Sequence, residues 1–139
     1  MELRQANKLD IPAMHRVRLS VRENTLSDPN RITESDYLAA LDELGRTWVV
    51  VANGEIVAFA TGYKSGSIWA LFVHPDHEGR GYGKTLHSAV VTWLWSLGHR
   101  RIWLTTASGT RAEHFYMSQG WQSCGTVPGE DIRLELSAS

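Results

Sequence analysis

Three glycines at alternate positions, Gly79, Gly81 and Gly83, constrain the fold most, because they separate a β-rich run from an amphipathic helical pattern. The run before them is SIWALFV at 67–73, and a second run, RIWLTT at 101–106, comes after the helical pattern. A strand, a helix and a strand in this order predict a right-handed crossover between two parallel strands. The apolar residues at helical spacing are Leu86, Ala89, Val90, Trp93, Leu94 and Leu97, and Gly98 stands where a C-terminal cap is expected.

The segments before this crossover predict two helices and an antiparallel meander. A first strand is expected at 2–5, followed by a helix that Asp10 caps and that ends near Asn24. After a predicted loop at 25–31, Thr33 caps a second helix that Gly45 closes. The β-rich runs 47–52 and 55–63 are joined by Asn53-Gly54, a strong hairpin signal, and a turn at 64–66 leads to 67–73.

The C-terminal part adds a short helix at 110–119 and strands at 121–127 and 131–136. The complete order is therefore β-α-α-β-β-β-α-β-α-β-β. We expect an α/β (α+β) fold with a mixed, mostly antiparallel central sheet and one parallel pair of strands.

Length and composition exclude several classes of protein. A chain of 139 residues, 42% hydrophobic and 21% charged, predicts one globular domain over 1–139. A formal net charge of −1 disfavours nucleic acid and anionic membranes as partners. Cys124 is the sole cysteine, and no N-terminal apolar segment resembles a signal peptide. These features predict a cytoplasmic protein.

The segment GRGYG at 79–83, called the glycine loop below, predicts an anion site. A P-loop would require a glycine at the position of Glu78, and the spacing G-x-G-x-G does not match the dinucleotide fingerprint G-x-G-x-x-G. Backbone N–H groups from Gly79 to Lys84, the helix dipole and two cationic side chains, Arg80 and Lys84, together suit a pyrophosphate. The alternative is a glycine-rich turn without a ligand.

Two separated motifs resemble those of the GCN5-related N-acetyltransferase (GNAT) family. The segment FVHPDHEGRGYGKTLHSAVVTWL is similar to its coenzyme A-binding motif, which Val73, Pro75, Gly81 and Gly83 match. The segment TRAEHFYMSQGW looks like the second signature of the same family. The resemblance covers nearly the whole chain and implies the GNAT fold, with helices on both faces of the sheet and a splayed parallel strand pair.

The resemblance also implies roles for particular residues. Acetyl-coenzyme A (acetyl-CoA) would lie in the wedge between the splayed strands, with its pyrophosphate on the glycine loop, and Tyr116 would donate a proton to the departing thiolate. The alternative for Tyr116 is a core aromatic. The cofactor-binding residues implied in this way are Leu71, Phe72, Val73, Gly79, Arg80, Gly81, Tyr82, Gly83, Lys84, Ser108 and Gly109.

The sequence departs from the family pattern at two positions. Glu78 stands where Gln or Arg is usual, so we expect its carboxylate to turn outward or to pair with Arg80. Gly109 stands where an asparagine that contacts the pantetheine arm is common, so Ser108, Thr110 or water would replace that contact. The run at 67–73 carries no acid, and we assign no general base.

Other polar residues carry weaker functional signals. No metal site is expected, because Pro75 between His74 and His77 prevents the helical spacing of metalloprotease ligands. Arg18, Arg22 and Glu23 lie where relatives build the floor of the acceptor site, or else they form a solvated helix end. Alternation alone leaves open whether Trp69 lines the acceptor pocket or packs beneath the helices.

The function implied is direct acetyl transfer from acetyl-CoA to a primary amine of a small molecule or a peptide. A non-catalytic acyl-CoA sensor is the alternative from another class. A P-loop phosphotransferase is disfavoured because RIWLTTAS at 101–108 offers no aspartate for magnesium. The resemblance also allows a homodimer.

Overall fold

The structure is a computed structural model that describes residues 1–21, 33–126 and 131–138. The predicted loop at 25–31 lies outside the described residues. The first helix ends at Ser20 with Val21 in an extended conformation, so the helix end predicted near Asn24 is wrong. Helices are α1 (Ile11–Ser20), α2 (Glu34–Leu41), α3 (Tyr82–Ser96) and α4 (Arg111–Ser118), with short 3-10 turns at Lys8–Asp10 and Pro75–His77. Strands are β1 (Glu2–Gln5), β2 (Gly45–Ala52), β3 (Glu55–Tyr63), β4 (Ser67–Val73), β5 (Arg101–Ala107), β6 (Gln122–Thr126) and β7 (Asp131–Ser137).

The strands form one seven-stranded sheet in the order β1-β2-β3-β4-β5-β7-β6. Every neighbouring pair is antiparallel except β4 and β5. The element order and the single parallel pair confirm the fold class predicted from the sequence. No helix in the described ranges has both the length and the apolar character needed to cross a membrane.

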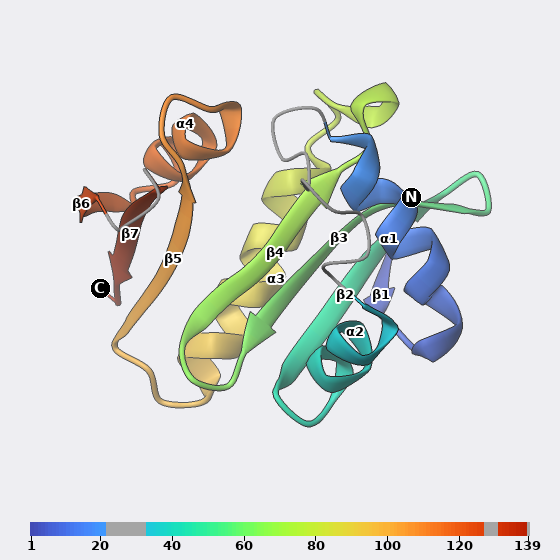
Figure 1. The fold of residues 1–139 in the computed structure, drawn as a ribbon, viewed down its shortest axis with the longest axis horizontal. Helices are drawn as coiled ribbons and strands as arrows, with labels where there is room; N and C mark the ends of the chain where they lie inside the picture. The colour runs from blue at the N-terminus through green and yellow to red at the C-terminus, as the bar shows by residue number, and fades with distance from the viewer. Residues whose placement is uncertain (22–32, 127–130, 139) are drawn as a thin grey trace.

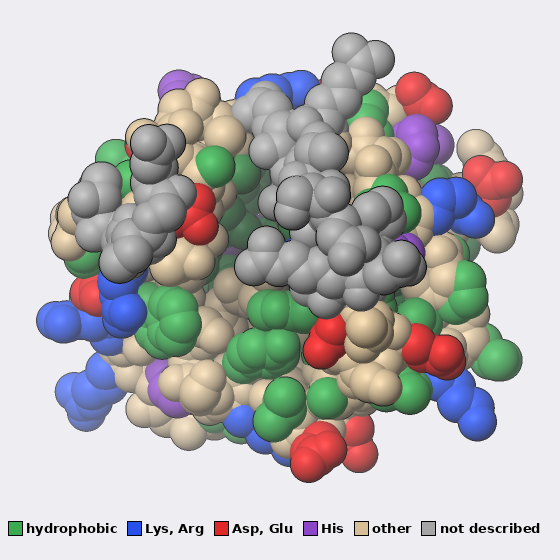
Figure 2. Space-filling model, viewed as in Figure 1, with side chains coloured by type: hydrophobic (Ala, Val, Ile, Leu, Met, Phe, Trp, Pro, Cys, Tyr) green, Lys and Arg blue, Asp and Glu red, His purple; other side chains and the backbone are tan. Residues whose placement is uncertain are grey.

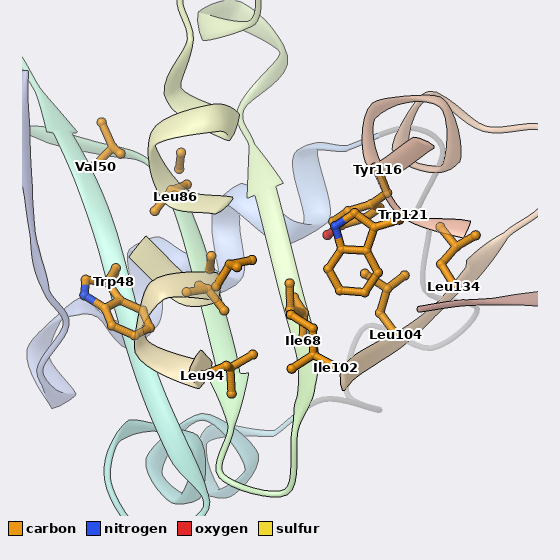
Figure 3. Packing of buried hydrophobic residues seen from close by; sticks show 14 of the residues in the cluster. Trp48, Val50, Ile68, Leu86, Leu94, Ile102, Leu104, Tyr116, Trp121 and Leu134 are labelled. Carbon is orange, nitrogen blue, oxygen red and sulfur yellow. The ribbon is translucent and has the colours of Figure 1, made fainter. Parts of the chain in front are cut away.

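Helices cover both faces of the sheet (Figure 1), and each face has its own core. Leu86, Val90 and Leu94 of α3 pack on one face together with Trp48, Ile102 and other strand residues, several of which Figure 3 labels. Gly62 of β3 makes this packing close, because a Cβ there would lie 2.9 Å from Val90 Cγ1. On the opposite face, Met14 and Val17 of α1 and Tyr37 of α2 surround Phe59.

Local signals explain most element boundaries. Thr33 and Asp36 form a reciprocal capping box that starts α2. Asn53 and Gly54 both have positive φ values, 53° and 79°, as the tightest hairpin turn requires. Gly98, with φ 98°, follows the last turn of α3 as predicted.

Two predicted caps differ in the structure. Asp10 is the N-cap residue of α1 as predicted, but its side chain makes no capping hydrogen bond. Its carboxylate instead accepts hydrogen bonds from Arg4 and from the Asn7 N–H of the preceding 3-10 turn. Gly45 does not close α2, which ends at Leu41. It begins β2, where a Cβ would overlap the carbonyl oxygen of Gly62.

The parallel strands β4 and β5 meet at one end only. Ser67 and Trp103 form their one paired position, and the Trp103 N–H donates to the Gly66 carbonyl at 3.0 Å. Beyond this bridge the two strands diverge toward their carboxyl ends (Figure 1). The divergence places an opening in the middle of the sheet, next to the glycine loop that follows β4.

Candidate active site

The glycine loop presents backbone donors at the start of α3. Gly79 and Gly81 have φ values of 76° and 82°, in the left-handed region that favours glycine. Gly81 is the N-cap of α3 and offers no side-chain cap, and the first amide to bond back within the helix is that of Thr85, which donates to the Gly81 carbonyl. The N–H groups of Tyr82, Gly83 and Lys84 therefore have no partner within the helix, which suits an anion.

A cavity of about 750 Å³ extends from the glycine loop through the opening between β4 and β5. Space remains where a Cβ of Gly79 or Gly81 would lie, since no atom stands within 4 Å of either position. Among the predicted site residues, the lining includes Leu71, Phe72, Val73, Gly79, Gly81, Tyr82, Gly83, Lys84 and Tyr116. The molecule is hollowed on the α1 and α2 face beside β5 and α4 (Figure 2).

Three predicted cofactor-binding residues, Arg80, Ser108 and Gly109, do not line this cavity. All three are exposed. The Gly109 N–H donates to the carboxylate of Glu113, so this amide is already engaged.

Glu78 pairs with a residue other than the one expected. Its carboxylate accepts from Arg111 of α4 at 2.6 Å, rather than from Arg80. The sequence order suggested Arg80, but the approach of α4 to the loop after β4 brings Arg111 across the cavity mouth. Both residues of the pair line the cavity.

Tyr116 is a buried residue of α4 with a side chain 6% exposed. Its ring packs edge-on against Phe115 and Trp121, and Figure 3 shows Tyr116 and Trp121 side by side above Leu104. Within the described residues its hydroxyl has no hydrogen-bond partner, and burial raises the pKa of Tyr116 strongly. The hydroxyl is therefore kept protonated and is available to a ligand in the cavity.

His87 of α3 packs against the rings of Phe115, Tyr116 and Trp121. Its Nε2 accepts from the indole N–H of Trp121 at 2.9 Å, so its proton is on Nδ1. Burial lowers the pKa of His87, which favours the neutral ring that this hydrogen bond requires. Sequence patterns gave no signal for His87, because its partner Trp121 is 34 positions away.

The other end of the cavity is formed by Arg18 of α1 and by Trp69 and Phe72 of β4, called the Arg18 end below. Arg18 is not a solvated helix end, because its side chain is 8% exposed. Its guanidinium stands 5.2 Å from the ring centre of Trp69 and 4.9 Å from that of Phe72. Trp69 packs against the core on the α1 and α2 face, so its side chain lies on that face of the sheet. Arg22 and Glu23 lie outside the described residues.

Asp131 is a lining residue outside the site predicted from the sequence. It opens β7 opposite Ala107 of β5 and lies three positions before Leu134, which packs with Leu104 in the core on the α3 face. Alternation along β7 therefore directs Asp131 to the α1 and α2 face, where the Arg18 end also lies. The one available sequence signal was an acid at the start of a strand.

Histidines near the loop do not form a metal centre. Within the described ranges, no group of three or more His, Cys, Asp or Glu side chains is arranged to hold a metal. The Nδ1 of His74 accepts from the Asp76 N–H at 3.1 Å, and His77 lines the cavity.

A family model described as the acetyltransferase (GNAT) family matches residues 11–121, which is most of the chain. An uncharacterised ycf52-like N-acetyltransferase of Prochlorococcus marinus is 40% identical over 55 residues. That alignment covers 40% of this chain and 29% of the relative, so it spans less than a third of the relative's length.

Solved structures share the fold over nearly their whole length. The PaiA N-acetyltransferase of Thermoplasma acidophilum, in complex with coenzyme A, has a TM-score of 0.83 at 14% identity, covering 99% of this chain and 98% of that one. The protein yncA of Salmonella typhimurium, with its cofactor acetyl-CoA, has a TM-score of 0.80 at 18% identity, covering 100% and 94%. At sequence identities of 14% and 18%, the structural likeness establishes the fold alone.

Proposed function

Because this chain belongs to the acetyltransferase (GNAT) family, whose acetyl donor is acetyl-CoA, we propose that it transfers acetyl directly to a primary amine of a small molecule or a peptide. One observation carries the proposal. A single cavity contains both the unpaired amides at the start of α3 and the buried hydroxyl of Tyr116. We propose further that residues 1–139 act as one N-acetyltransferase domain.

The residues present fit the coenzyme. The amides of Tyr82, Gly83 and Lys84, with the cationic side chain of Lys84, would hold the pyrophosphate. Beyond the bridge from Ser67 to Trp103, the described part of β5 does not pair with β4. Backbone groups of β4 that face the cavity, from Leu71 to Val73, are therefore open to the amides of a pantetheine arm.

Bound acetyl-CoA supplies a thioester whose carbonyl carbon accepts an amine and whose sulfur can leave as a thiolate. In this proposal Tyr116 donates its hydroxyl proton to that sulfur while the C–S bond breaks. Because burial raises the pKa of Tyr116, the hydroxyl first acts as a hydrogen-bond donor and gives up its proton only as negative charge develops on sulfur.

The neutral amine must lose a proton as the new C–N bond forms. Within the described residues, Asp131 is the carboxylate of the cavity lining that forms no salt bridge with an arginine, whereas Glu78 pairs with Arg111. We therefore assign Asp131 as the group that takes this proton, directly or through water. Exchange with solvent then returns a proton to Tyr116 and removes one from Asp131, so the protein is unchanged after each turnover.

The first experiment is calorimetric titration of the full chain with acetyl-CoA, beside magnesium-ATP and NADH. Acetyl-CoA alone should bind. The loaded protein is then mixed with a panel of amines, and release of the free thiol and acetylation of the amine are followed together, with Tyr116→Phe as the control. Binding without acetylation of any amine would instead favour the non-catalytic acyl-CoA sensor, and binding of magnesium-ATP alone would overturn the ligand assignment.

A further inference from the structure

Arg18 is a buried cation whose donors are only partly used. Its Nε and Nη1 atoms are enclosed and have no hydrogen-bond partner in the described part of the chain. Burial lowers the pKa of Arg18, and the nearby hydroxyl of Tyr37 favours its charged form. The two aromatic rings beneath the guanidinium stabilise its charge but accept no conventional hydrogen bond.

No described carboxylate of the chain forms a salt bridge with Arg18. Asp36 is the acid close enough to act on Arg18 electrostatically, but its carboxylate accepts from the backbone N–H and the hydroxyl of Thr33 in the cap of α2. A buried charge without a partner destabilises a folded protein, so an unpaired arginine in a cavity wall points to a ligand.

Arg18 lies on the face of the sheet opposite to the proposed pyrophosphate site. Trp69 and Phe72, which carry the guanidinium, pack with the core on the α1 and α2 face. Leu71 and Val73 pack with the core on the α3 face, whose helix begins at the glycine loop. Arg18 therefore reaches the cavity from the face opposite to the unpaired amides, where the second substrate would enter.

We propose that Arg18 binds a carboxylate of the amine acceptor, so that the substrate class is compounds with a primary amine and a nearby carboxylate. This inference rests on the proposed function. The planar guanidinium matches a carboxylate in geometry, and one cation matches one negative charge. Asp131 lines the same cavity, and its negative charge attracts the amine of the acceptor. The same negative charge repels anions, so it disfavours an acceptor with a dianionic group such as phosphate.

Two sources can supply the carboxylate, a free amino acid or an acidic side chain next to a peptide N-terminus. The test compares kcat/KM for two matched pairs of acceptors. One pair is an amino acid and its carboxamide, and the other is a dipeptide amide with Asp or with Asn at the second position. We expect the carboxylate member of one pair to be preferred by about 10- to 100-fold.

Arg18→Met should reduce this preference to about 2-fold or less, because the side chain keeps its length but loses its donors. Arg16→Met is the matched control, since Arg16 is an exposed cation of the same helix and should keep the preference. Arg18→Lys should restore part of it through charge alone. A wild-type protein that prefers neither carboxylate, or a preference that survives Arg18→Met, would overturn the inference.

Binding is measured separately so that a failure of catalysis does not decide the outcome. N-acetylated forms of the same acceptor pairs are titrated into the protein saturated with coenzyme A. Tighter binding of the carboxylate form that depends on Arg18 supports the inference even if no amine is acetylated, a result that would reject the proposed function alone. Equal binding of acid and amide in wild type and Arg18→Met rejects the inference.

Loss of folding would not explain the expected result. Arg18→Met removes a buried charge that has no salt-bridge partner in the described ranges, so its melting temperature in the absence of ligand should equal or exceed that of the wild type. Weakened carboxylate binding in a variant of undiminished stability is the combination that a structural role alone would not produce.

Discussion

The two ends of the cavity differ in the chemical groups that line them. The glycine-loop end consists of backbone N–H groups supplied by consecutive residues, with the exposed cation of Lys84 at its edge. The Arg18 end consists of side chains from α1 and β4, which lie about fifty positions apart in the chain, and its cation is buried. Backbone donors suit a group that every family member must bind, whereas side chains can change without changing the fold.

This difference predicts that substitutions at the two ends change different constants. Changes in the glycine loop should weaken coenzyme binding for every acceptor. Changes at the Arg18 end should alter the choice of acceptor and leave coenzyme affinity unaffected. Tyr116 and Asp131 line the cavity between these ends, and in the proposed mechanism they act on the bonds that form and break.

The largest effect on coenzyme affinity is expected for Gly81→Val. A branched side chain at φ 82° strains the turn, and its bulk enters the space that the coenzyme would use, so affinity should fall on the order of 10²-fold or more. Calorimetry with acetyl-CoA measures the loss. Gly54→Val is the matched control, since Gly54 has φ 79° and open space around it but lies in the β2–β3 hairpin away from the cavity. Undiminished affinity in Gly81→Val would reject the loop assignment.

Tyr116→Phe should lower kcat about 10³-fold while coenzyme affinity stays close to that of the wild type. Tyr82→Phe removes a hydroxyl from the same cavity and should keep the rate. The pKa of Tyr116 is raised because burial disfavours the phenolate, so kcat of the wild type should show no loss from Tyr116 ionisation below about pH 10. Equal rates in wild type and Tyr116→Phe would remove Tyr116 from the mechanism.

Asp131→Asn should lower kcat on the order of 10²-fold, because the amide cannot accept the proton of the amine. Glu135→Gln, on the same strand but outside the cavity lining, is the control. Steady-state kinetics with a saturating amine separates this effect from weaker acceptor binding. If Asp131→Asn turns over at the wild-type rate, water or another group takes the proton.

The smallest effect is expected for Glu78→Gln, which breaks the pair with Arg111 at the cavity mouth. The Glu78 side chain is 36% exposed, so the free energy of unfolding should change by less than about 1 kcal/mol. Loss of a carboxylate beside the predicted pyrophosphate site should tighten acetyl-CoA binding by about 2- to 5-fold at low salt. Asp76→Asn, in the neighbouring 3-10 turn and outside the lining, should leave affinity unchanged. Weaker binding in Glu78→Gln would mean that the ion pair helps to shape the mouth.

Sequence patterns were most informative where a property depends on neighbouring residues. The hairpin at Asn53-Gly54, the capping box at Thr33 and the amphipathic pattern of α3 all rest on local conformation, and each is present in the structure. Predictions were wrong where a long-range contact overrides local preference. Gly45 resembles a helix terminator, but the carbonyl of Gly62 on the next strand requires a glycine there.

The candidate site divides in the same way. Its coenzyme half was predicted from one continuous motif, and Gly79, Gly81, Gly83 and Lys84 all line the cavity. The partner of Glu78 was not predictable, because Arg111 is 33 positions away and approaches only through the placement of α4.

The sequence by itself determined the order of elements, the glycine loop with its free amides, and the family. These features depend on backbone conformation and periodicity, which a few consecutive residues specify. Only the tertiary structure decided that Arg18 is buried without a carboxylate partner among the described residues, that Trp69 lies beneath it, and that Asp131 lines the same cavity. The divergence of β4 from β5 brings these residues to one opening, and the register of the sheet sets which side chains face it.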